Sequence, residues 1–372
     1  MIFDPQLQYK IGITLIKGIG NVLAKNLIAY LGNVEAIFSE SPKRLAKIPG
    51  IGELLAKEIS QQDVLKRADK EVEFILKNGI TPIYHTDQAY PFRLKECADS
   101  PIMLYAKSNT DLNTGRYVGV VGTRNATEYG KELCKSFLND LASTQPDVCI
   151  VSGLAYGIDI CAHKAALDFS SKTIAVIGHG LDRIYPATHR SVAVKMLENG
   201  GLLTEYLSET NPDRQNFVMR NRIIAGMCDA IVVVESGSKG GSLITANLAQ
   251  SYNRDVFAFP GRVGDDLSAG CNQLIKSNKA ALIESATDLE YYMGWEKHTE
   301  KKETIQPALF VHLTAEQQTL VSYLHKEKNG LQMNQLAISL GMPISKISSM
   351  LLELEFSGVV KCSPGNVYKL AI

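Results

Sequence analysis

The chain has 372 residues, of which 45% are hydrophobic and 21% charged, and its 39 Lys and Arg balance its 39 Asp and Glu. Zero net charge excludes a protein that binds polyanions through overall positive charge, so any such site must be a local patch. No apolar run reaches the roughly 18 residues of a membrane span. The start of the chain has no basic region before an apolar core, so we expect a cytoplasmic protein without a signal peptide. The seven cysteines include no CxxC pair and no metal-ligand spacing, which predicts reduced thiols and neither metal nor cofactor.

Residues 1–62 contain a near repeat, since Gly18-Ile19-Gly20 and Gly50-Ile51-Gly52 each precede an amphipathic helical pattern. The pair resembles two helix-hairpin-helix motifs, whose tight turns offer backbone N–H groups to DNA phosphates without reading bases. Gly18, Gly20, Gly50 and Gly52 are the possible phosphate contacts. In the alternative interpretation, these glycines only let helices approach each other. Glu53 disfavours contact at the second turn because its charge would lie near the phosphate.

Residues 63–115 are predicted to be a connector into the core. Their first part, 63–78, is charged with helical character, and short extended segments follow, punctuated by Pro82, Pro91 and Pro101.

Residues 116–292 alternate short apolar runs with helical patterns. Strands are expected near 117–121, 148–151, 173–177, 201–204, 230–234 and 255–259, and helices at 129–141, 158–167, 189–198 and 242–252. Nearly unbroken apolar strands in this alternation predict a parallel sheet covered on both faces. Ligands of such sheets bind at the carboxyl ends of the strands.

Residues 293–313 are polar and predict a linker, and 314–372 read as three helices and a β-hairpin, which resembles a winged helix. Its recognition-helix candidate, 344–356, carries Lys346 but also Glu353 and Glu355, so docking to a protein and reading of DNA both stay open. The predicted fold is therefore α/β: a Rossmann-like parallel-sheet core flanked by an N-terminal all-α helix-hairpin-helix domain and a C-terminal winged helix.

Two glycine-containing turns follow the first two core strands. Gly122 and Arg124 belong to the first, and Ser152 and Gly153 to the second. A turn of this kind places backbone N–H groups and a helix N-terminus at one point, which attracts phosphate, and Arg124 adds a guanidinium fork.

Familiar catalytic motifs do not match these turns. The first turn lacks GxGxxG, and the later turn Lys239-Gly240-Gly241-Ser242 has P-loop residue types in the wrong order. Ser152 is outside a GxSxG elbow, so with Asp159 and His163 it does not predict a hydrolase triad. His163 is expected to be a helix-surface or packing residue.

Residues 213–226 combine arginines with an aromatic ring. Arg214, Phe217, Arg220, Asn221 and Arg222 lie within nine positions. Single-stranded nucleic acid needs such charge compensation together with a ring on which bases stack. Alternatively, Phe217 belongs to the core and one arginine forms a structural ion pair, and these residues alone leave both interpretations open.

Six separated motifs stand in the order typical of the DNA-processing protein A family, also called DprA or Smf. They are GTRNATEYG, SGLAYGIDICAHKAAL, VIGHGLDRIYP, FVMRNRIIAG, GGSLITANLA and FAFPGRV. The upstream YPFRL and SPIMLYAK segments also resemble the beginning of that family's core, so the resemblance covers about residues 80–290. It implies a homodimeric protein that binds single-stranded DNA and loads a RecA-type recombinase on incoming DNA during natural transformation, without catalysis.

The resemblance also implies which residues contact DNA. Carried onto this chain, these are Gly122, Arg124, Ser152, Gly153, Arg214, Phe217, Arg220, Asn221, Arg222, Lys239, Gly240, Gly241 and Ser242. The chain departs from the family pattern at Gly240, where serine is usual, and at Val218, where proline is usual. Neither departure removes a charged residue, so the expected positive charge of the pocket is retained.

Two other functions compete with this one. A phosphoribohydrolase acting on nucleoside monophosphates resembles the same core, but its loop PGGxGTxxE carries a glutamate, whereas GGSLITANLA has no carboxylate. A transcriptional regulator would read DNA with the winged helix, which is weakly basic for that role.

Overall fold

The computed structural model describes residues 4–295, 313–327, 330–363 and 365–371. A nine-stranded sheet forms its centre, in the order β1-β2-β6-β5-β4-β3-β7-β8-β9. The strands are β1 (Thr81–Tyr84), β2 (Met103–Ser108), β3 (Arg116–Val121), β4 (Val148–Ser152), β5 (Lys172–Val176), β6 (Gly200–Thr204), β7 (Ala230–Val233), β8 (Asp255–Ala258) and β9 (Ala281–Leu282). From β6 to β9 all neighbours are parallel, which confirms the predicted parallel core.

Helices cover both faces of this sheet because successive side chains of its strands alternate between them. On β3, Val118 and Val120 pack under α8 (Glu128–Thr144), α9 (Ile158–Asp168) and α14 (Ala286–Met293). Tyr117 and Val121 point to the other face, which is covered by α7 (Phe92–Lys95), α11 (Arg214–Met227), α12 (Gly241–Ser251) and α13 (Ala269–Lys276). A short helix, α10 (Arg190–Met196), packs near α9.

The segment 63–115 is more than a connector. Its strands β1 and β2 extend the sheet in antiparallel pairing with each other and with β6. Pro82 is compatible with β1 because β1 is an edge strand, where a missing N–H costs no ladder bond. Its helix α6 (Leu65–Asn78) instead packs on the N-terminal helix α1 (Leu7–Leu15) and shares that domain's core.

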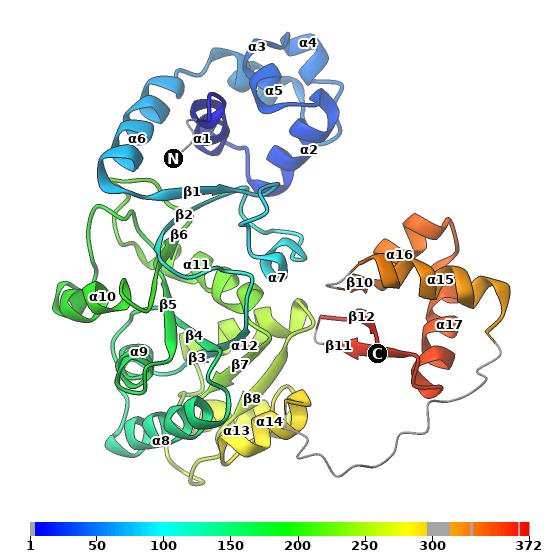
Figure 1. Ribbon diagram of the computed structural model, residues 1–372. Coiled ribbons are helices and arrows are strands. Elements are labelled where there is room, and N and C mark those ends of the chain that lie inside the picture. The colour runs from blue at the N-terminus through cyan, green and yellow to red at the C-terminus, as the bar shows by residue number, and fades with distance from the viewer. Residues whose placement is uncertain (1–3, 296–312, 328–329, 364, 372) are drawn as a thin grey trace.

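The N-terminal helices lie at the β1 edge of the sheet (Figure 1). After α1 come α2 (Asn21–Leu31), α3 (Val34–Ser39), α4 (Pro42–Leu45) and α5 (Glu53–Gln61). Gly18 and Gly50 have positive φ angles of 82° and 85°. A Cβ on Gly18 would lie 3.0 Å from Leu55, and one on Gly50 would lie 2.9 Å from Leu23. Each turn thus abuts the leucine of the other repeat, which is a packing reason for the repeated glycine.

The C-terminal domain has the three helices and the hairpin that the sequence predicts. Its elements are α15 (Ala315–Lys326), β10 (Leu331–Gln332), α16 (Met333–Leu340), α17 (Ile344–Phe356), β11 (Val360–Ser363) and β12 (Val367–Leu370). The linker expected at 293–313 lies mostly outside the described residues. Within the described residues, no single helix is long and apolar enough to cross a membrane, and only α16 and α17 together reach that length, with a 116° bend between them.

Candidate nucleic-acid interface

The candidate site lies where the direction of strand addition reverses. Strands β3, β4, β5 and β6 follow one another to one side of β3, whereas β7 and β8 continue on the other side. In open parallel sheets, ligands bind outside the carboxyl ends of the strands at such a reversal. The loops after β3 and β7 meet there, since Thr123 N–H donates to the Glu235 carbonyl over 2.7 Å. These loops hold Gly122 and Arg124 on one side and Lys239–Ser242 on the other.

An exposed guanidinium and two aromatic rings form the clearest contact surface at this edge. The Arg124 Cζ lies 5.7 Å from the centre of the Phe217 ring, and Phe217 stacks on Tyr185 with a 5.7 Å centroid distance and a 23° interplanar angle. Tyr185 is 47% exposed, so its ring is open to a ligand. The absence of a side chain at Gly178 admits the Phe217 ring, because a Cβ there would lie 2.9 Å from Phe217 Cδ1.

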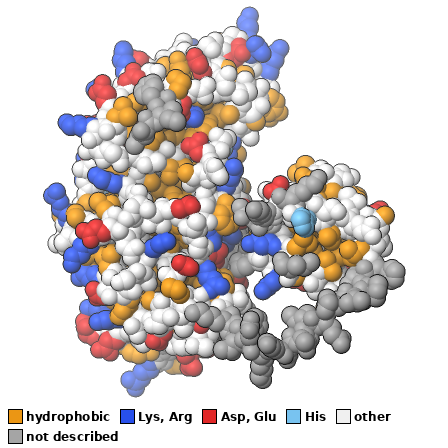
Figure 2. All heavy atoms as spheres, in the orientation of Figure 1, with side chains coloured by type: hydrophobic (Ala, Val, Ile, Leu, Met, Phe, Trp, Pro, Cys, Tyr) orange, Lys and Arg blue, Asp and Glu red, His pale blue; other side chains and the backbone are white. Residues whose placement is uncertain are grey.

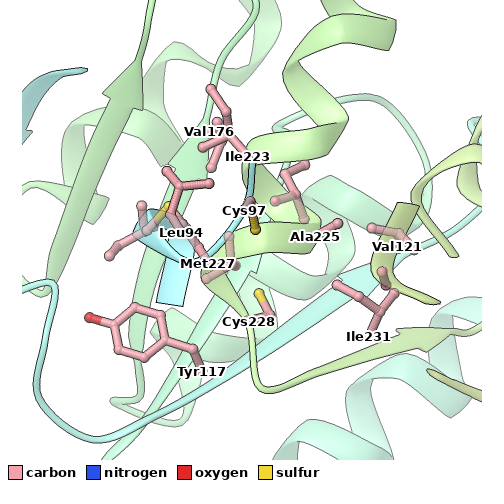
Figure 3. Close-up of a cluster of buried hydrophobic side chains, with 14 of the residues drawn as sticks. Leu94, Cys97, Tyr117, Val121, Val176, Ile223, Ala225, Met227, Cys228 and Ile231 are labelled. Carbon is pink, nitrogen blue, oxygen red and sulfur yellow. The ribbon is translucent and has the colours of Figure 1, made fainter. Parts of the chain in front are cut away.

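Helix α11 holds Phe217 near the protein surface because one end of the helix is buried and the other is exposed. Its C-terminal half is buried in the core, where Ile223 and Met227 lie among Leu94 and Cys97 (Figure 3). Its N-terminal residue Arg214 is exposed. Phe217 is half-buried, so it is neither a core residue nor a freely rotating one. The alternative that Phe217 belongs to the core is therefore not what the structure shows.

The other two arginines of this segment are structural. Arg220 is only 4% exposed and donates to the carbonyls of Gly153, over 2.8 Å, and Val176. Burial lowers its pKa to about 10, and the charge of Asp159 opposes that shift. Arg220 therefore ties the ends of β4 and β5 to α11 and does not face solvent.

Arg222 is also 4% exposed and bridges distant parts of the chain. It pairs with the Glu205 carboxylate and donates to the Asp99 carbonyl over 2.8 Å. The expectation that Arg220 and Arg222 directly line a DNA pocket is thus not met in this structure, because both guanidinium groups are committed to internal partners. Asn221, between them, is half-buried and accepts from Arg220 Nε over 3.2 Å.

The second glycine turn is likewise used internally. Ser152 is fully buried and donates its hydroxyl to the Val120 carbonyl over 2.6 Å. The Gly153 N–H donates to Asp159 Oδ2 over 3.1 Å. Gly153 is required by packing, because a Cβ there would lie 2.4 Å from Arg220 Nη2. The expected phosphate donors of this turn are therefore not free.

In the first turn the Arg124 side chain is exposed, whereas the N-terminus of α8 is capped by other residues of the protein. Gly122 is needed for packing, since a Cβ there would lie 2.4 Å from Ile158. The N-terminus of α8 is capped by Thr127, whose hydroxyl accepts from the Gly130 N–H over 3.0 Å. Glu235 adds a carboxylate that accepts from the Thr127 N–H over 2.9 Å. Negative charge at a helix N-terminus stabilises the helix, and here the protein itself supplies it.

The turn before α12 is the more accessible helix N-terminus at this edge. Its capping residue, Gly240, has no side chain, and a Cβ on the exposed Gly241 would meet nothing within 4 Å. Lys239 is exposed beside it. Ser242 is buried and donates to Ser236 Oγ over 2.8 Å, so its hydroxyl belongs to the scaffold. Lys239 and Gly241 thus remain suited to a phosphate.

A neighbouring cleft of about 950 Å³ is acidic. It is lined by Glu235, Asp265 and Asp266, with Arg262 among them. Carboxylates repel a polyanion, so the arginine–aromatic face is the better nucleic-acid surface of the two. His163 is not part of either, because it is fully buried, pairs with Thr173 over 2.7 Å, and burial lowers its pKa to about 3.

The glycines of both helix-hairpin-helix turns are exposed, and the first turn lies against the core. The first is docked on the core: the Ile102 N–H donates to Asn21 Oδ1 over 3.1 Å, and Lys25 Nζ donates to Ser100 Oγ over 2.7 Å. Gly20 lines a cavity of about 260 Å³ at this junction. A Cβ on Gly20 or Gly52 would meet nothing within 4 Å. These two glycines therefore have no packing reason of the kind found at Gly18 and Gly50.

One site residue escaped the sequence reasoning. Tyr185 lies in the loop that follows β5, before a cis peptide bond to Pro186. Tyr185 belongs to the VIGHGLDRIYP motif, so the motif could have identified it, and its contact with Phe217 shows its place in the site.

Comparison with known proteins confirms the family. Three family models match: DNA recombination-mediator protein A over residues 81–293, a SAM-like helix-hairpin-helix tandem over 12–62, and the DprA winged helix domain over 306–366. Protein Smf of Synechocystis is 32% identical over 400 residues, covering 98% of this chain and 99% of that protein. The DNA processing protein DprA of Bacillus subtilis is 41% identical over 214 residues, covering 57% of this chain and 71% of that protein.

Solved structures agree. The X-ray structure of DNA processing protein A from Streptococcus pneumoniae superposes with a TM-score of 0.66 at 33% identity, covering 76% of this chain and 97% of that one. The Helicobacter pylori protein, described for its single-stranded DNA binding mode, gives a TM-score of 0.53 at 30% identity, covering 59% of this chain and 97% of that one. With its core, both flanking domains and its relatives in agreement, the chain belongs to the DNA-processing protein A (DprA/Smf) family of DNA recombination mediators.

Proposed function

We propose that this protein binds single-stranded DNA at the carboxyl edge of its parallel sheet. The observation that supports this most directly is the contact of the exposed Arg124 and Tyr185 with the half-buried Phe217 ring. A guanidinium over stacked rings offers both a phosphate partner and a platform for bases, which a flexible single strand can reach and a paired duplex cannot. Arg214 and Lys239 add positive charge at the same edge, and Gly241 adds a backbone N–H at the start of α12.

The buried members of the motif have a supporting role in this proposal. Arg220, Arg222, Ser152 and Gly153 fix the loops and α11 and do not touch the strand. Asn221 lies one helical turn beyond Phe217 and extends the same side of α11. The membership of the family and the Helicobacter relative support single-stranded DNA as the ligand.

The membership of the family supports a proposal for the cellular role as well. The protein protects incoming DNA during transformation and loads a RecA-type recombinase on it, acting as a cytoplasmic homodimer without turnover. This part is tested by RecA-type strand exchange on DNA covered by a single-strand binding protein, with and without this chain. No stimulation of exchange would contradict the loading role while leaving DNA binding untouched.

The two competing functions have weaker support. The Glu235 carboxylate, which follows β7 at this edge, is buried and accepts hydrogen bonds from Thr127, so it is poorly placed as a phosphoribohydrolase acid. The α17 helix of the winged-helix domain presents Leu352 and Phe356, 55% and 85% exposed, and its Lys346 pairs with Glu316. Such a surface suits DNA reading less well than a basic one.

The test is fluorescence anisotropy with labelled oligo-dT and a duplex of equal length across a salt series, without nucleotide. The proposal predicts salt-sensitive preference for the single strand, lost in Arg124→Ala and kept in Lys135→Ala, which removes an exposed charge in the middle of α8. Preference for duplex would favour the regulator. No binding to either would favour the enzyme, and nucleoside monophosphate turnover would then be assayed.

A further inference from the structure

A second cationic site lies between the winged-helix domain and the core. A cavity of about 290 Å³ is lined on the core side by Arg93, Arg116 and Arg254, and on the wing side by Lys361 and Lys369. Figure 2 shows Lys and Arg side chains gathered where the two domains meet. This cavity shares no residue with the Arg124 face.

The two wing lysines face each other. Lys361 on β11 and Lys369 on β12 are directly opposed in the antiparallel register, so they project from the same side of the hairpin. Like charges in this arrangement repel and destabilise a hairpin. The hairpin turn is seated on the core, where the Gly365 N–H donates to the Asn253 carbonyl over 2.7 Å. Lys361 is exposed and Lys369 half-buried, and both line the cavity opposite the core arginines.

The arginines on the core side are only partly compensated. Arg93 pairs with Asp229 over 2.6 Å, and Arg254 with Glu96 over 3.0 Å. Both arginines are buried, and among the described residues Arg93 Nη1 and Arg254 Nε find no hydrogen-bond partner. An unpaired buried guanidinium N–H is costly unless a ligand accepts from it.

The third core cation, Arg116, has no carboxylate partner among the ion pairs of the described residues. It donates to the Gln145 side chain and lies with its Cζ 5.0 Å from the Trp295 ring centre. Five cations therefore surround a cavity that is lined by only two carboxylates, Glu96 and Asp229, each already paired. The excess positive charge of the cavity favours the binding of an anion.

We propose that this cavity binds a phosphate group that bridges the wing and the core. Guanidinium forks and ammonium groups are the side chains that phosphate oxygens prefer, and here they converge from both domains. The bound phosphate neutralises the opposed lysines and holds the winged-helix domain on the core. Its source is either a DNA backbone or a free phosphate compound, which share this chemistry.

The fluorescence of one tryptophan can report ligand binding in this cavity. Trp295 is the single tryptophan of the protein and lines the cavity next to Arg116. Full-length protein is titrated with inorganic phosphate at constant ionic strength while tryptophan emission is recorded. We expect a saturable change in the wild type that becomes at least about tenfold weaker in Lys361→Gln/Lys369→Gln, because two charged hydrogen bonds are lost.

The matched control is Lys346→Gln, which removes an exposed wing-domain lysine that pairs with Glu316 outside the cavity and should leave the response intact. Circular dichroism establishes that each variant is folded, and the single variant Lys369→Gln is measured as well in case the double variant unfolds. A wild type without a saturable response to phosphate or DNA, or a response equal in all variants, would overturn the proposal.

The source of the phosphate is distinguished in the Arg124→Ala background, which removes a cation of the proposed single-strand site. A response to unphosphorylated oligo-dT that depends on Lys361 and Lys369 assigns the site to DNA backbone phosphates. A lysine-dependent response to inorganic phosphate alone assigns it to a free phosphate compound. Because the variants lie in different parts of the fold, failure here leaves single-strand binding at Arg124 unaffected, and the converse also holds.

Discussion

The Glu235 carboxylate accepts two hydrogen bonds from Thr127, from its backbone N–H over 2.9 Å and from its hydroxyl over 2.7 Å. This pair joins the end of β7 to the start of α8. It occupies the helix N-terminus at which a glycine-turn motif would place a phosphate. The positive end of α8 is therefore neutralised from within, and phosphate contacts shift to Arg124 and to the start of α12.

We expect Glu235→Gln to lower the free energy of unfolding by about 1–2 kcal/mol, because a charged hydrogen-bond acceptor at a helix N-terminus is lost. Single-strand affinity should stay unchanged. Urea unfolding and anisotropy measure the two effects. Glu128→Gln is the control, since Glu128 is exposed in the same helical turn. Unchanged stability together with altered affinity would show that Glu235 faces the DNA instead.

Phe217→Ala should cost about 1–3 kcal/mol of single-strand binding free energy if the ring stacks a base. Tyr185→Ala should have a smaller effect, and the double variant should cost less than the sum, because the two rings act as one platform. The four affinities form a double-mutant cycle. Strict additivity, or a large loss of thermal stability with intact binding, would contradict the shared platform.

Arg124→Ala and Arg214→Ala should each flatten the salt dependence of single-strand binding, because fewer DNA phosphates are neutralised by the protein. The log–log slope should fall by about 0.7 for each phosphate that is no longer neutralised. The measurement is anisotropy at several salt concentrations. Lys135→Ala keeps the slope of the wild type, because Lys135 lies on α8 away from the strand ends. A slope unchanged by Arg124→Ala would remove this residue from the interface.

Arg220→Ala should behave differently from Arg214→Ala. It leaves Asp159 buried without a cation and strips the Gly153 and Val176 carbonyls of a donor, so we expect a loss of about 3–5 kcal/mol of stability. Arg214→Ala should be as stable as the wild type, since Arg214 is exposed. Thermal unfolding separates the two. If Arg220→Ala were as stable as the wild type but lost single-strand binding, Arg220 would be a DNA contact.

These contrasts show where sequence reasoning reaches its limit. The apolar runs predict the strands of the parallel sheet because burial on both faces demands them. They miss the role of β1, which contains Pro82, and of β2, which follows Pro101. From the motif, Arg220 and Arg222 are predicted to contact the ligand. The structure differs because the sequence of an arginine-rich segment reveals neither the burial of each arginine nor its partners. Asp159 and Glu205, which compensate them, come from other elements.

The same limit applies to glycine. Gly18 and Gly20 are equivalent in the motif, yet Gly18 has a positive φ and abuts Leu55, whereas Gly20 borders open space. Gly18→Ala should therefore cost about 1–2 kcal/mol of stability from backbone strain, and Gly20→Ala much less. Chemical unfolding of both variants checks this. Equal stability of the two, with DNA binding lost only in Gly18→Ala, would favour phosphate contact over packing.

The final prediction concerns His163, which is fully buried, bonded to Thr173, and has its pKa lowered by burial to about 3. In the unfolded chain the histidine titrates near its ordinary pKa of about 6.5. Between these values the unfolded state binds more protons, so the stability contributed by neutral His163 is complete above pH 6.5 and is lost as the pH falls toward 3. From pH 7 to 5 we expect this residue to remove on the order of 2 kcal/mol of stability.

In His163→Gln, which does not titrate, the fall in stability between these pH values should be smaller by that amount, whatever the variant's stability at pH 7. Urea unfolding of both proteins at the two pH values provides the comparison, and parallel pH profiles would show that His163 accepts its proton without unfolding the core.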